Sequence, residues 1–547
     1  AMGTGALVVC FFGDGAVNQG AFHEAANLAG VWRLPVIYLI ENNLYAVATA
    51  SKNACAVGDL SLRAASYGMR GLIVDGMDPL AIYSAVSNAA EEIRKGGGPC
   101  IIEARCYRHY HHGGGKLGSA YGYRSRAEEE EWLRKDAVAH FPAATIEAGR
   151  LTKPEIDTML EKAHVLVGQA VEYCTTPGAP RAVRANLWPK PERLSVGLRS
   201  PGREWDGVVF SDLDDYYEFD QMRYSDAIAA VSGRWLERDE RVMVLGEEVA
   251  NFGGGSYGAT KGLPSKYPGR VLNTSISEAG FVGLACGAAM SGLKPIVEVM
   301  YPDFSLLAAD QLFNQIAKLR HIYGGDADIP LVVRTRVAIG CGYGGQHSMD
   351  PVALYALFPG WRMVIPSNAF DYIGLFNTAM RSLDPVLIVE HHSLYRRKFR
   401  VPKGDLDYLI PFGKARIVRP GNDVTALTYG AMVDRCRGLA DKLAERGVSC
   451  EVIDLRTLDM PGIDYDAITR SVIKTGKAVI VEEAPYSQSI GGTIAAVIQE
   501  RSFDYLDGPV LRVASQDVPF PVSRALEQAV VAGDEEILRA LTSAAGD

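Results

Sequence analysis

The chain has 547 residues, 48% of them hydrophobic and 22% charged, and is long and apolar enough for several buried cores of a globular protein. Its 56 basic and 65 acidic residues give a net charge of -9, so a broad nucleic-acid interface, which requires clustered positive charge, is not expected. No apolar run approaches the roughly 20 residues of a membrane span and no basic leader opens the sequence, which predicts a cytoplasmic protein without a membrane contact. The nine cysteines form no Cys-x-x-Cys pair and suit reduced thiols better than disulfides or a zinc site.

The first part of the chain alternates apolar strands with helical segments, a pattern typical of α/β domains. Strands are expected at residues 6–12, 34–40, 71–76 and 100–107, and a helix at 81–95. We expect the resulting parallel sheet to be buried on both faces. A polar loop rich in glycine and histidine follows at residues 107–126, then a charged helix from about Ala127 and another from about Pro154.

Two further α/β blocks follow residues 176–220, whose Pro, Arg, Gly and Asp content predicts a linker. The second block begins at Arg223, with strands expected at 241–248, 270–276, 295–300, 330–337, 361–366 and 385–391 and helices at 280–292 and 306–320. The third begins near Phe412, with strands expected at 423–430, 450–458, 477–484 and 509–515. The blocks share no readable internal repeat, and the fold class we predict is three consecutive α/β domains.

An aspartate and an asparagine each follow an apolar strand of the first block. Asp14, in the sequence Gly13-Asp14-Gly15, comes after the first strand, and Asn43 comes after the second. Parallel strands joined by a helix end at the same edge of a sheet, so we expect these side chains to lie close together. The Asp14 carboxylate, the Asn43 amide oxygen and the Tyr45 backbone carbonyl would form an oxygen-ligand site suited to Mg²⁺.

The order and spacing of this motif resembles the thiamine-diphosphate motif, in which the metal joins the cofactor's diphosphate to the protein. By this resemblance Gly13, Gly15 and Ala16 would contact the diphosphate. Residues 276–318 and 344–348 are similar to the β chain of the thiamine-dependent first component of 2-oxo acid dehydrogenase complexes, and the first block is similar to the α chain. The resemblance covers nearly the whole sequence in the order α then β, which implies a fusion of two subunits that are usually separate.

Transketolase and deoxyxylulose phosphate synthase share this domain order and cofactor, but three local motifs resemble the dehydrogenase family instead. These motifs are Ile276–Gly280, Gln346–Ser348 and the loop Tyr107–Gly113. The resemblance implies two thiamine-diphosphate-binding-fold sheets and a transketolase C-terminal-like domain. The expected boundaries are 1–140 for the α-chain-like diphosphate and magnesium domain, 141–220 for a helical segment and linker, 221–405 for the pyrimidine-binding domain and 406–547 for the C-terminal-like domain.

The resemblance also implies roles for single residues. Glu278 would hydrogen-bond the aminopyrimidine ring of the cofactor and favour the tautomer that deprotonates the thiazolium carbon. His112 and His347 would supply acid and base groups near neutrality during transfer of the acyl unit to a lipoyl group. The remaining implied cofactor contacts are Arg108 at the diphosphate, Phe304 stacked on the aminopyrimidine, Ile276 and Met300.

Three departures from the family pattern affect the expected site. The loop carries Tyr110 where the family usually has His or Arg, and Gly113 where it has Ser, so substrate contacts there stay open. The family's α chains also have a long segment before the Gly-Asp-Gly motif, whereas twelve residues precede it here. We therefore expect one of three explanations: the chain is a fragment, a separate polypeptide completes the first domain, or the protein has lost this part of the site.

Three other functions stay open. Gly340, Gly342 and Gly345 fit the G-x-G-x-x-G pattern of dinucleotide-binding oxidoreductases, but no clear helix opens on them, and a chance glycine-rich loop is favoured. A stand-alone carboligase, acyloin-forming or transketolase-like, would share the cofactor and use an aldehyde as acceptor. A non-catalytic relic that only binds a partner is disfavoured by the presence of the site residues.

The function that we predict is oxidative decarboxylation of a small 2-oxo acid with thiamine diphosphate and Mg²⁺, followed by acyl transfer to a lipoyl group. The resemblance implies a homodimer equivalent to the usual α2β2 assembly, and a lipoyl-bearing acyltransferase as a partner of the third block. The sequence does not decide between pyruvate, acetoin and a branched-chain acid, because one methylene changes binding by only about 1–3 kcal/mol.

Overall fold

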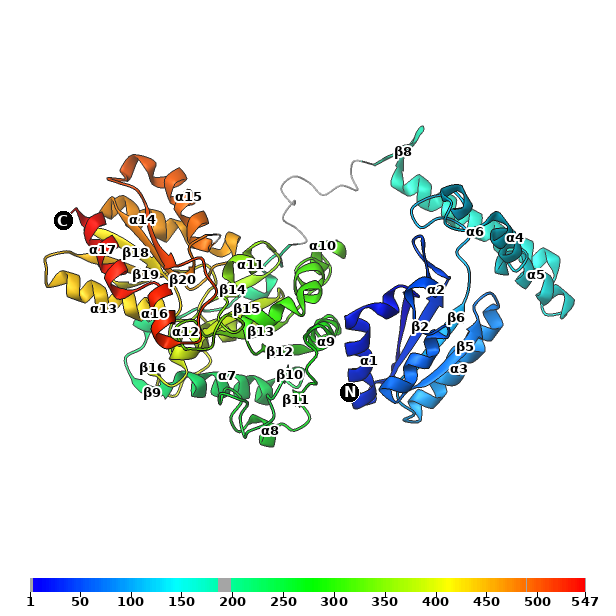
Figure 1. The fold of residues 1–547 in the computed structure, drawn as a ribbon, viewed down its shortest axis with the longest axis horizontal. Helices are drawn as coiled ribbons and strands as arrows, with labels where there is room; N and C mark the ends of the chain where they lie inside the picture. The colour runs from blue at the N-terminus through cyan, green and yellow to red at the C-terminus, as the bar shows by residue number, and fades with distance from the viewer. Residues whose placement is uncertain (1–2, 185–197, 488, 547) are drawn as a thin grey trace. The chain divides into compact units, whose positions relative to one another are not determined.

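The computed structural model describes residues 3–184, 198–487 and 489–546 (Figure 1). The chain forms two compact units, which meet in the sequence at Leu194 and Ser195. The amino-terminal unit contains one main sheet, and the carboxy-terminal unit contains two. Part of the predicted linker, residues 185–197, lies outside the described residues, and the four domain boundaries stay predictions. In the described ranges no helix is long and apolar enough to cross a membrane.

The main sheet of the amino-terminal unit has four parallel strands. In spatial order they are β1 (Val8–Gly13), β2 (Val36–Asn42), β6 (Cys100–Arg105) and β5 (Arg70–Asp75). Helix α1 (Gly20–Trp32) joins β1 to β2, and α3 (Pro79–Arg94) joins β5 to β6. Ile40 of β2 packs in the cluster with α1 and Ile37 in the cluster with α3, as the alternating direction of strand side chains requires. All four expected strands and the helix expected at 81–95 are present.

The prediction that this sheet is buried on both faces is correct for its central strands and wrong for its edges. The side chains of β2 and β6 are mostly buried, whereas Val8 and Phe11 of β1 are 58% and 64% exposed and Ile73 of β5 is 45% exposed. Each edge strand has a single neighbour, and the two helices do not reach over both faces of all four strands.

Three helices follow the polar loop. They are α4 (Arg126–Leu133), α5 (Ala137–Glu147) and α6 (Lys153–Cys174). The first and third are the helices predicted near Ala127 and Pro154, whereas the sequence pattern does not predict α5, which contains Pro142. Helix α6 begins after Thr152, whose backbone N–H donates to Glu155 Oε2 at 2.7 Å, so a capping box specifies its start. The short elements are η1 (Ala16–Asn18), α2 (Ser51–Ala54), η2 (Leu60–Tyr67), η3 (Gly118–Tyr121), and the hairpins β3 (Tyr45–Ala46) with β4 (Thr49–Ala50) and β7 (Thr175–Thr176) with β8 (Ala179–Val183).

The first sheet of the carboxy-terminal unit has six parallel strands, all of them expected from the sequence. In spatial order they are β11 (Val271–Asn273), β10 (Val242–Gly246), β12 (Lys294–Val299), β13 (Val332–Val337), β15 (Val386–His391) and β14 (Arg362–Val364). Its helices are α7 (Tyr224–Arg238), α8 (Leu263–Lys266), α9 (Glu278–Met290), α10 (Leu319–Ile322), α11 (Val352–Ala356) and α12 (Ala369–Arg381). Helices α7 and α12 pack against each other, and α9 packs against β12. The sequence pattern does not predict the antiparallel pair β9 (Phe219–Arg223) and β16 (Lys398–Pro402).

The helical segment expected at residues 306–320 is divided into parts. A 3₁₀ helix, η8 (Pro302–Leu306), leads to a π-helix, η9 (Asp310–Ile316), and then to α10. The Trp361 indole donates to the Leu312 carbonyl at 3.0 Å and so competes for an acceptor of the helix, which is a physical reason for the wider turn. Gly360 permits this approach, because a Cβ there would collide with the Ala317 carbonyl oxygen.

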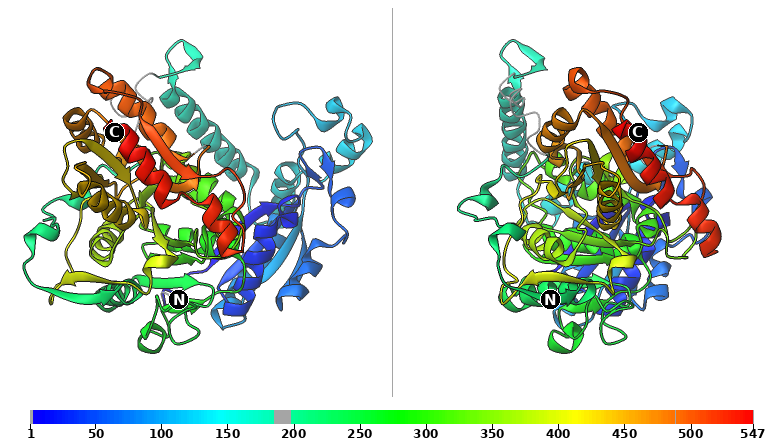
Figure 2. Two further views of the ribbon diagram at one scale, coloured as in Figure 1. Left: turned by 60° about the vertical axis from the view of Figure 1, so that its left-hand side comes forward. Right: turned by 90° about the vertical axis from the view of Figure 1, so that its left-hand side faces the viewer.

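The second sheet of this unit has five strands, four of which were expected. In spatial order they are β17 (Arg416–Arg419), β19 (Cys450–Asp454), β18 (Val424–Thr428), β20 (Ala478–Pro485) and β21 (Leu511–Ser515), with β17 antiparallel and the rest parallel. Its helices are α13 (Met432–Ala444), α14 (Tyr465–Thr475), α15 (Ile490–Ser502), α16 (Arg524–Val530) and α17 (Asp534–Ala545). Helix α17, red in Figure 2, packs beside α13 over β18 and β20. The short 3₁₀ helices of the unit are η6 (Arg203–Trp205), η7 (Leu213–Asp215), η10 (His392–Leu394), η11 (Met460–Gly462) and η12 (Phe503–Tyr505).

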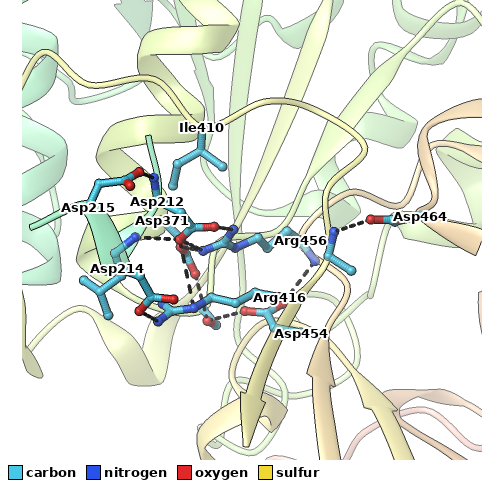
Figure 3. A network of polar contacts seen from close by, with 12 residues as sticks. Asp212, Asp214, Asp215, Asp371, Ile410, Arg416, Asp454, Arg456 and Asp464 are labelled. Atoms are coloured by element: carbon cyan, nitrogen blue, oxygen red, sulfur yellow. Dashed lines mark hydrogen bonds and ion pairs between the residues drawn. The ribbon is translucent and has the colours of Figure 1, made fainter. Parts of the chain in front are cut away.

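A polar network joins both sheets of the carboxy-terminal unit to the segment before β9 (Figure 3). Arg456, which is fully buried, donates to both carboxylate oxygens of Asp212 at 2.8 and 3.0 Å and to Asp371 Oδ1 at 2.5 Å. Asp212 belongs to the predicted linker, so the end of that linker is anchored on the carboxy-terminal unit. Asp454 accepts a hydrogen bond from the Ser367 hydroxyl at 2.6 Å, and burial together with the Asp371 charge raises the pKa of Asp454 to about 7.

Candidate active site

Asp14 lies at the carboxyl edge of the amino-terminal sheet, directly after β1. It is 2% exposed, and neither of its carboxylate oxygens accepts a hydrogen bond of normal geometry from the described residues. Burial raises the pKa of Asp14 above its ordinary value, and the backbone N–H groups of Asp14 and Asn43 together with the positive charge of Arg108 oppose this only in part. A carboxylate that is buried and so weakly hydrogen-bonded is stabilised by a cation or a proton, so Asp14 has the properties of a metal ligand.

Asn43 and Tyr45 lie on the turn that follows β2, the strand next to β1. The Tyr45 backbone N–H donates to Asn43 Oδ1 at 3.3 Å, and Leu44 and Val47 have φ angles of 72° and 57°. Such left-handed conformations are costly for these residues, and they are found mainly where a site holds them in place. Gly15 is needed here, because a Cβ on it would lie 2.6 Å from Ala46 Cβ and push this turn away from Asp14.

Arg108 ties the histidine-rich loop to this turn. Its Nη2 donates to the Val47 carbonyl at 2.6 Å and its Nε donates to the Tyr110 carbonyl at 3.0 Å. Arg108 therefore lies at the predicted metal site, and its pairing with a diphosphate stays a prediction. His112 is exposed on the same loop, whereas the ring of His111 packs on Tyr121 with centroids 4.4 Å apart.

A buried ion pair, which the sequence pattern does not reveal, supports the loop. Arg124 Nε lies 2.8 Å from Glu129 Oε1, with both side chains almost fully buried, and Arg124 Nη1 donates to the Arg108 carbonyl at 2.7 Å. Glu128 accepts hydrogen bonds from the hydroxyls of Tyr45 and Tyr107, each at 2.9 Å. The first turn of α4 thus fixes both the loop and the Asn43 turn.

In the carboxy-terminal unit, Glu278 is the first residue of α9 and is 5% exposed. A second carboxylate, Glu247, follows β10 at the carboxyl edge of the sheet, the edge where open α/β sheets bind ligands. Burial raises the pKa of Glu247 to about 7, and the negative charge of Glu278 adds to this shift. A carboxyl group with a pKa near neutrality can give up or accept a proton, so Glu247 suits proton exchange with a ligand. No motif in the sequence singles out Glu247.

His347 and Phe304 come together in the structure. Their ring centroids are 5.4 Å apart, and the His347 ring also packs on Tyr301 with centroids 4.7 Å apart. Met300 lies half-buried just before Tyr301, whereas Ile276 is 85% exposed. The pyrimidine-side residues therefore lie at one edge of this sheet, and their contacts with a cofactor stay predictions.

Arg336 forms a second cluster at this edge, also without a signal in the sequence. Its guanidinium carbon lies 3.2 Å from the centroid of the Tyr257 ring and 4.6 Å from that of Tyr301. The Tyr257 and Tyr301 hydroxyls are hydrogen-bonded to each other at 2.7 Å. Burial, reinforced by the charge of Arg336, lowers the pKa of His392 to about 4, so His392 is neutral at physiological pH.

The dinucleotide-binding alternative is not supported. The backbone N–H groups of Gly340 and Gly342 donate to the carboxylate of Glu527, so a protein side chain occupies the place that a phosphate would take. No helix opens on these glycines, since the next helix, α11, begins at Val352. The loop is a glycine-rich connection, as the sequence pattern favours.

Three family matches cover most of the chain. Residues 1–182 match the dehydrogenase E1 component, residues 220–398 the pyrimidine binding domain of transketolase, and residues 413–537 the C-terminal domain of transketolase.

The chain is also similar to named proteins. The mitochondrial β subunit of the pyruvate dehydrogenase E1 component of Dictyostelium discoideum is 40% identical over 336 residues, which are 61% of this chain and 94% of that protein. The β subunit of the acetoin:2,6-dichlorophenolindophenol oxidoreductase of Cupriavidus necator is 39% identical over 314 residues, 56% of this chain and 92% of that protein. Among solved structures, a split-gene transketolase, an inactive β4 tetramer, is 20% identical with a TM-score of 0.48, and the match covers 59% of this chain and 98% of that one.

The order of the matches and the three sheets define a transketolase-like α/β protein. The chain belongs to the dehydrogenase E1 components, the thiamine-diphosphate-dependent first components of 2-oxo acid dehydrogenase complexes. The fold class and the resemblance inferred from the sequence are thereby confirmed, with the E1 domain and both transketolase domains in a single chain.

Proposed function

We propose that this chain decarboxylates a small 2-oxo acid with thiamine diphosphate and transfers the acyl group to a lipoyl group of an acyltransferase. The observation that carries this proposal is the buried carboxylate of Glu278 beside the half-buried Glu247 at the sheet edge of the pyrimidine-binding domain. This pair provides a carboxylate and a proton donor where the ring of the cofactor must be held. A homodimer and a cytoplasmic location are part of the proposal.

The amino-terminal unit fits Mg²⁺ and a diphosphate. Asp14 offers a buried carboxylate whose oxygens accept no hydrogen bond of normal geometry from the described residues, and Gly15 leaves room for the turn that brings Asn43 and Tyr45 close. A carboxylate, an amide oxygen and a backbone carbonyl are the hard ligands that Mg²⁺ prefers, with phosphate oxygens completing its shell. Arg108 would add a positive charge beside the diphosphate.

When bound, thiamine diphosphate supplies the nucleophilic carbon and the electron sink for loss of carbon dioxide. Glu278 would accept a hydrogen bond from a ring nitrogen of the pyrimidine and hold the ring in the tautomer that acts as a base. Glu247, with a pKa near 7, would exchange a proton with Glu278 in either direction at physiological pH. Phe304 would limit the movement of the ring.

The two predicted histidines would serve the second half of the reaction. His347, held against Phe304 and Tyr301, would donate or accept a proton as the acyl group leaves for the lipoyl sulfur. His112, on its exposed loop, would contact the incoming lipoyl group. Tyr110 and Gly113 depart from the family pattern at positions expected to contact the substrate. The preferred 2-oxo acid is therefore determined by the experiment below.

The carboligase alternative is not favoured, because the named relatives are pyruvate and acetoin dehydrogenase components. Those names also define the substrates to compare first. The purified chain, with thiamine diphosphate and Mg²⁺, would be mixed with pyruvate, longer and branched 2-oxo acids, or acetoin in the presence of a dye acceptor. We expect dye reduction coupled to release of carbon dioxide from a 2-oxo acid. If only acetoin reduced the dye, acetoin and not a 2-oxo acid would be the substrate. Formation of a carbon–carbon bond with an added aldehyde would support the carboligase function.

A further inference from the structure

The loop that carries His347 is held by a domain that is distant from it in sequence. This glycine loop, residues 340–348, leaves the carboxyl end of β13 in the pyrimidine-binding sheet. Glu527, on α16 beside the second sheet, lies 187 positions further along the chain, and its side chain is fully buried. Its Oε1 accepts the Gly340 N–H at 2.9 Å and its Oε2 accepts the Gly342 N–H at 2.7 Å.

The geometry of this contact is that of an anion in a backbone nest. Gly340 and Gly342 have φ angles of 74° and 79°, which turn their N–H groups toward the same side of the loop. Hydrogen bonds from N–H groups to a carboxylate are roughly twice as strong as those between neutral groups. Exchange of Glu527 for a neutral residue would therefore leave the two backbone donors of the loop poorly satisfied.

Two further contacts hold the loop against the same domain. A Cβ on Gly344 would lie 2.6 Å from Val522 Cγ2, so the loop backbone packs directly on the segment before α16. Just beyond the loop, Asp350 accepts a hydrogen bond from the Tyr429 hydroxyl at 2.8 Å. The loop is thus held at its start and its middle, and the chain is held again directly after it.

The conformation of the loop sets the position of the His347 ring. The His347 N–H donates to the Gly344 carbonyl at 3.2 Å, and the Ser348 hydroxyl donates to the same carbonyl at 2.8 Å. The glycine that packs on Val522 is therefore the one that anchors the backbone of His347. A shift of the loop would move the ring from its contacts with Tyr301 and Phe304.

We propose that Glu527 is a positioning residue for His347, acting through the backbone of the glycine loop. This inference rests on the proposed function, since it assigns to the carboxy-terminal domain a part in the chemistry at His347. Glu527 does not reach the reacting atoms. It determines where the histidine stands, and a displacement of about 1 Å at such a group costs on the order of 100-fold in rate.

The test compares Glu527→Gln with Glu451→Gln in the full chain. Glu451 is a matched control, because it is a buried carboxylate of the same domain that accepts a hydrogen bond from the Ser471 hydroxyl at 2.5 Å and makes no contact with the loop among the interactions described. Each variant is also combined with His347→Ala. The measurements are kcat and KM for the 2-oxo acid with a lipoyl acceptor, and the imidazole NMR signal of His347 in histidine-labelled protein.

We expect Glu527→Gln to lower kcat about 10- to 100-fold with KM changed less than threefold. In the His347→Ala background the same substitution should cost less than twofold, whereas Glu451→Gln should have the same small effect in both backgrounds. If Glu527→Gln lowered kcat equally in the presence and in the absence of His347→Ala, the proposal would be overturned and Glu527 would have a purely structural role.

The NMR signal separates failure of this inference from failure of the proposed function. If the wild-type chain turned over no 2-oxo acid, the proposed function would fail, and the His347 signal would still answer the structural question. A shifted His347 signal in Glu527→Gln but not in Glu451→Gln would support the positioning contact. An unchanged signal in Glu527→Gln would contradict it.

Discussion

Asp14 is the residue whose surroundings most need a ligand. Its carboxylate is buried after β1, lacks donors of normal geometry among the described residues, and has a pKa raised by burial. Such a group weakens folding when it is charged and alone, and it binds a cation when one is present. Removal of the buried Asp14 charge should therefore stabilise the free protein and weaken the binding of the cofactor.

For Asp14→Asn we expect the affinity for thiamine diphosphate in Mg²⁺ to fall at least about tenfold, because a charged metal ligand is lost. The metal-free protein should unfold at the same or a higher temperature at pH 7, since a buried charge is removed. Calorimetric titration with Mg²⁺ and with a chelator, and thermal unfolding without ligand, measure the two effects. Asp75→Asn, at the end of β5 on the opposite edge of the same sheet and capping the Met77 N–H at 2.9 Å, is the control and should leave the affinity unchanged. An unchanged affinity in Asp14→Asn would exclude this residue as a ligand.

Among the secondary-structure elements, the π-helix η9 owes its wide turn to a hydrogen bond from Trp361, a residue outside the helix. The Trp361 indole N–H donates a hydrogen bond to the Leu312 carbonyl at 3.0 Å, and the Ala317 N–H donates to the same carbonyl at 3.3 Å. The wide turn is thus fixed by a tertiary hydrogen bond and by the close approach of Gly360, while the apolar spacing of the segment would suit an ordinary helix.

Trp361→Phe should loosen η9, because the phenyl ring keeps the apolar contact and loses the donor. We expect faster amide hydrogen exchange at residues 310–317 and a destabilisation of about 2 kcal/mol, the sum of a lost hydrogen bond and a small cavity. Trp235→Phe is the matched control: it loses the indole bond to Asn377 Oδ1 at 2.8 Å in the same unit and should leave exchange at η9 unchanged. Equal exchange at η9 in both variants would refute this origin of the π-helix.

The elements that the sequence predicts and those it misses differ in a physical way. The parallel strands of the carboxy-terminal unit mostly include short apolar runs, because parallel strands are buried on both faces. The pair β9 and β16 alternates charged and apolar residues at the surface, and β17 is an antiparallel edge strand, so neither shows such a run. Helix α5 contains Pro142, which argues against a helix unless the fold supports it.

The residues of the candidate site also differ in whether a short sequence motif reveals them or only a contact between residues distant in the sequence. Asp14, Asn43 and Glu278 lie in short motifs and are found from the sequence. The Arg124–Glu129 pair, Glu247 and Glu527 act through burial and through partners that local patterns do not contain. For Glu527 the partner is 187 residues away, and the only signal in the sequence was the glycine loop itself.

At the scale of the whole molecule, the network around Arg456 links stability to pH in the carboxy-terminal unit. The pKa of Asp454 is raised to about 7 from an ordinary 3.8, chiefly by burial and then by the Asp371 charge, which Arg456 opposes. A raised pKa means that the folded state binds the proton more tightly than the unfolded state, so this group destabilises the fold increasingly as pH rises from about 4 to about 7. Below about pH 4 both states are protonated and the effect is absent.

Asp454→Asn should therefore stabilise the unit at pH 8, on the order of 2 kcal/mol, because it fixes the side chain in a neutral form of the same size. The advantage over the wild type should shrink as pH falls and vanish near pH 4. Thermal unfolding measured across this pH range tests it. Asp441→Asn, at an exposed aspartate of the same domain paired with Arg419, should keep the pH dependence of the wild type. A constant difference between Asp454→Asn and wild type at all pH values would contradict the assignment.

The measurement that tests the account most directly is carbon dioxide release by Glu278→Gln beside the wild type, with thiamine diphosphate, Mg²⁺ and the 2-oxo acid that the wild type prefers. The substitution keeps the size of a nearly fully buried side chain and removes its charge. We predict a loss of at least about 100-fold in kcat with an intact fold, because the carboxylate that holds the ring tautomer is gone. Turnover equal to that of the wild type would contradict the role of Glu278 and with it the proposed reaction.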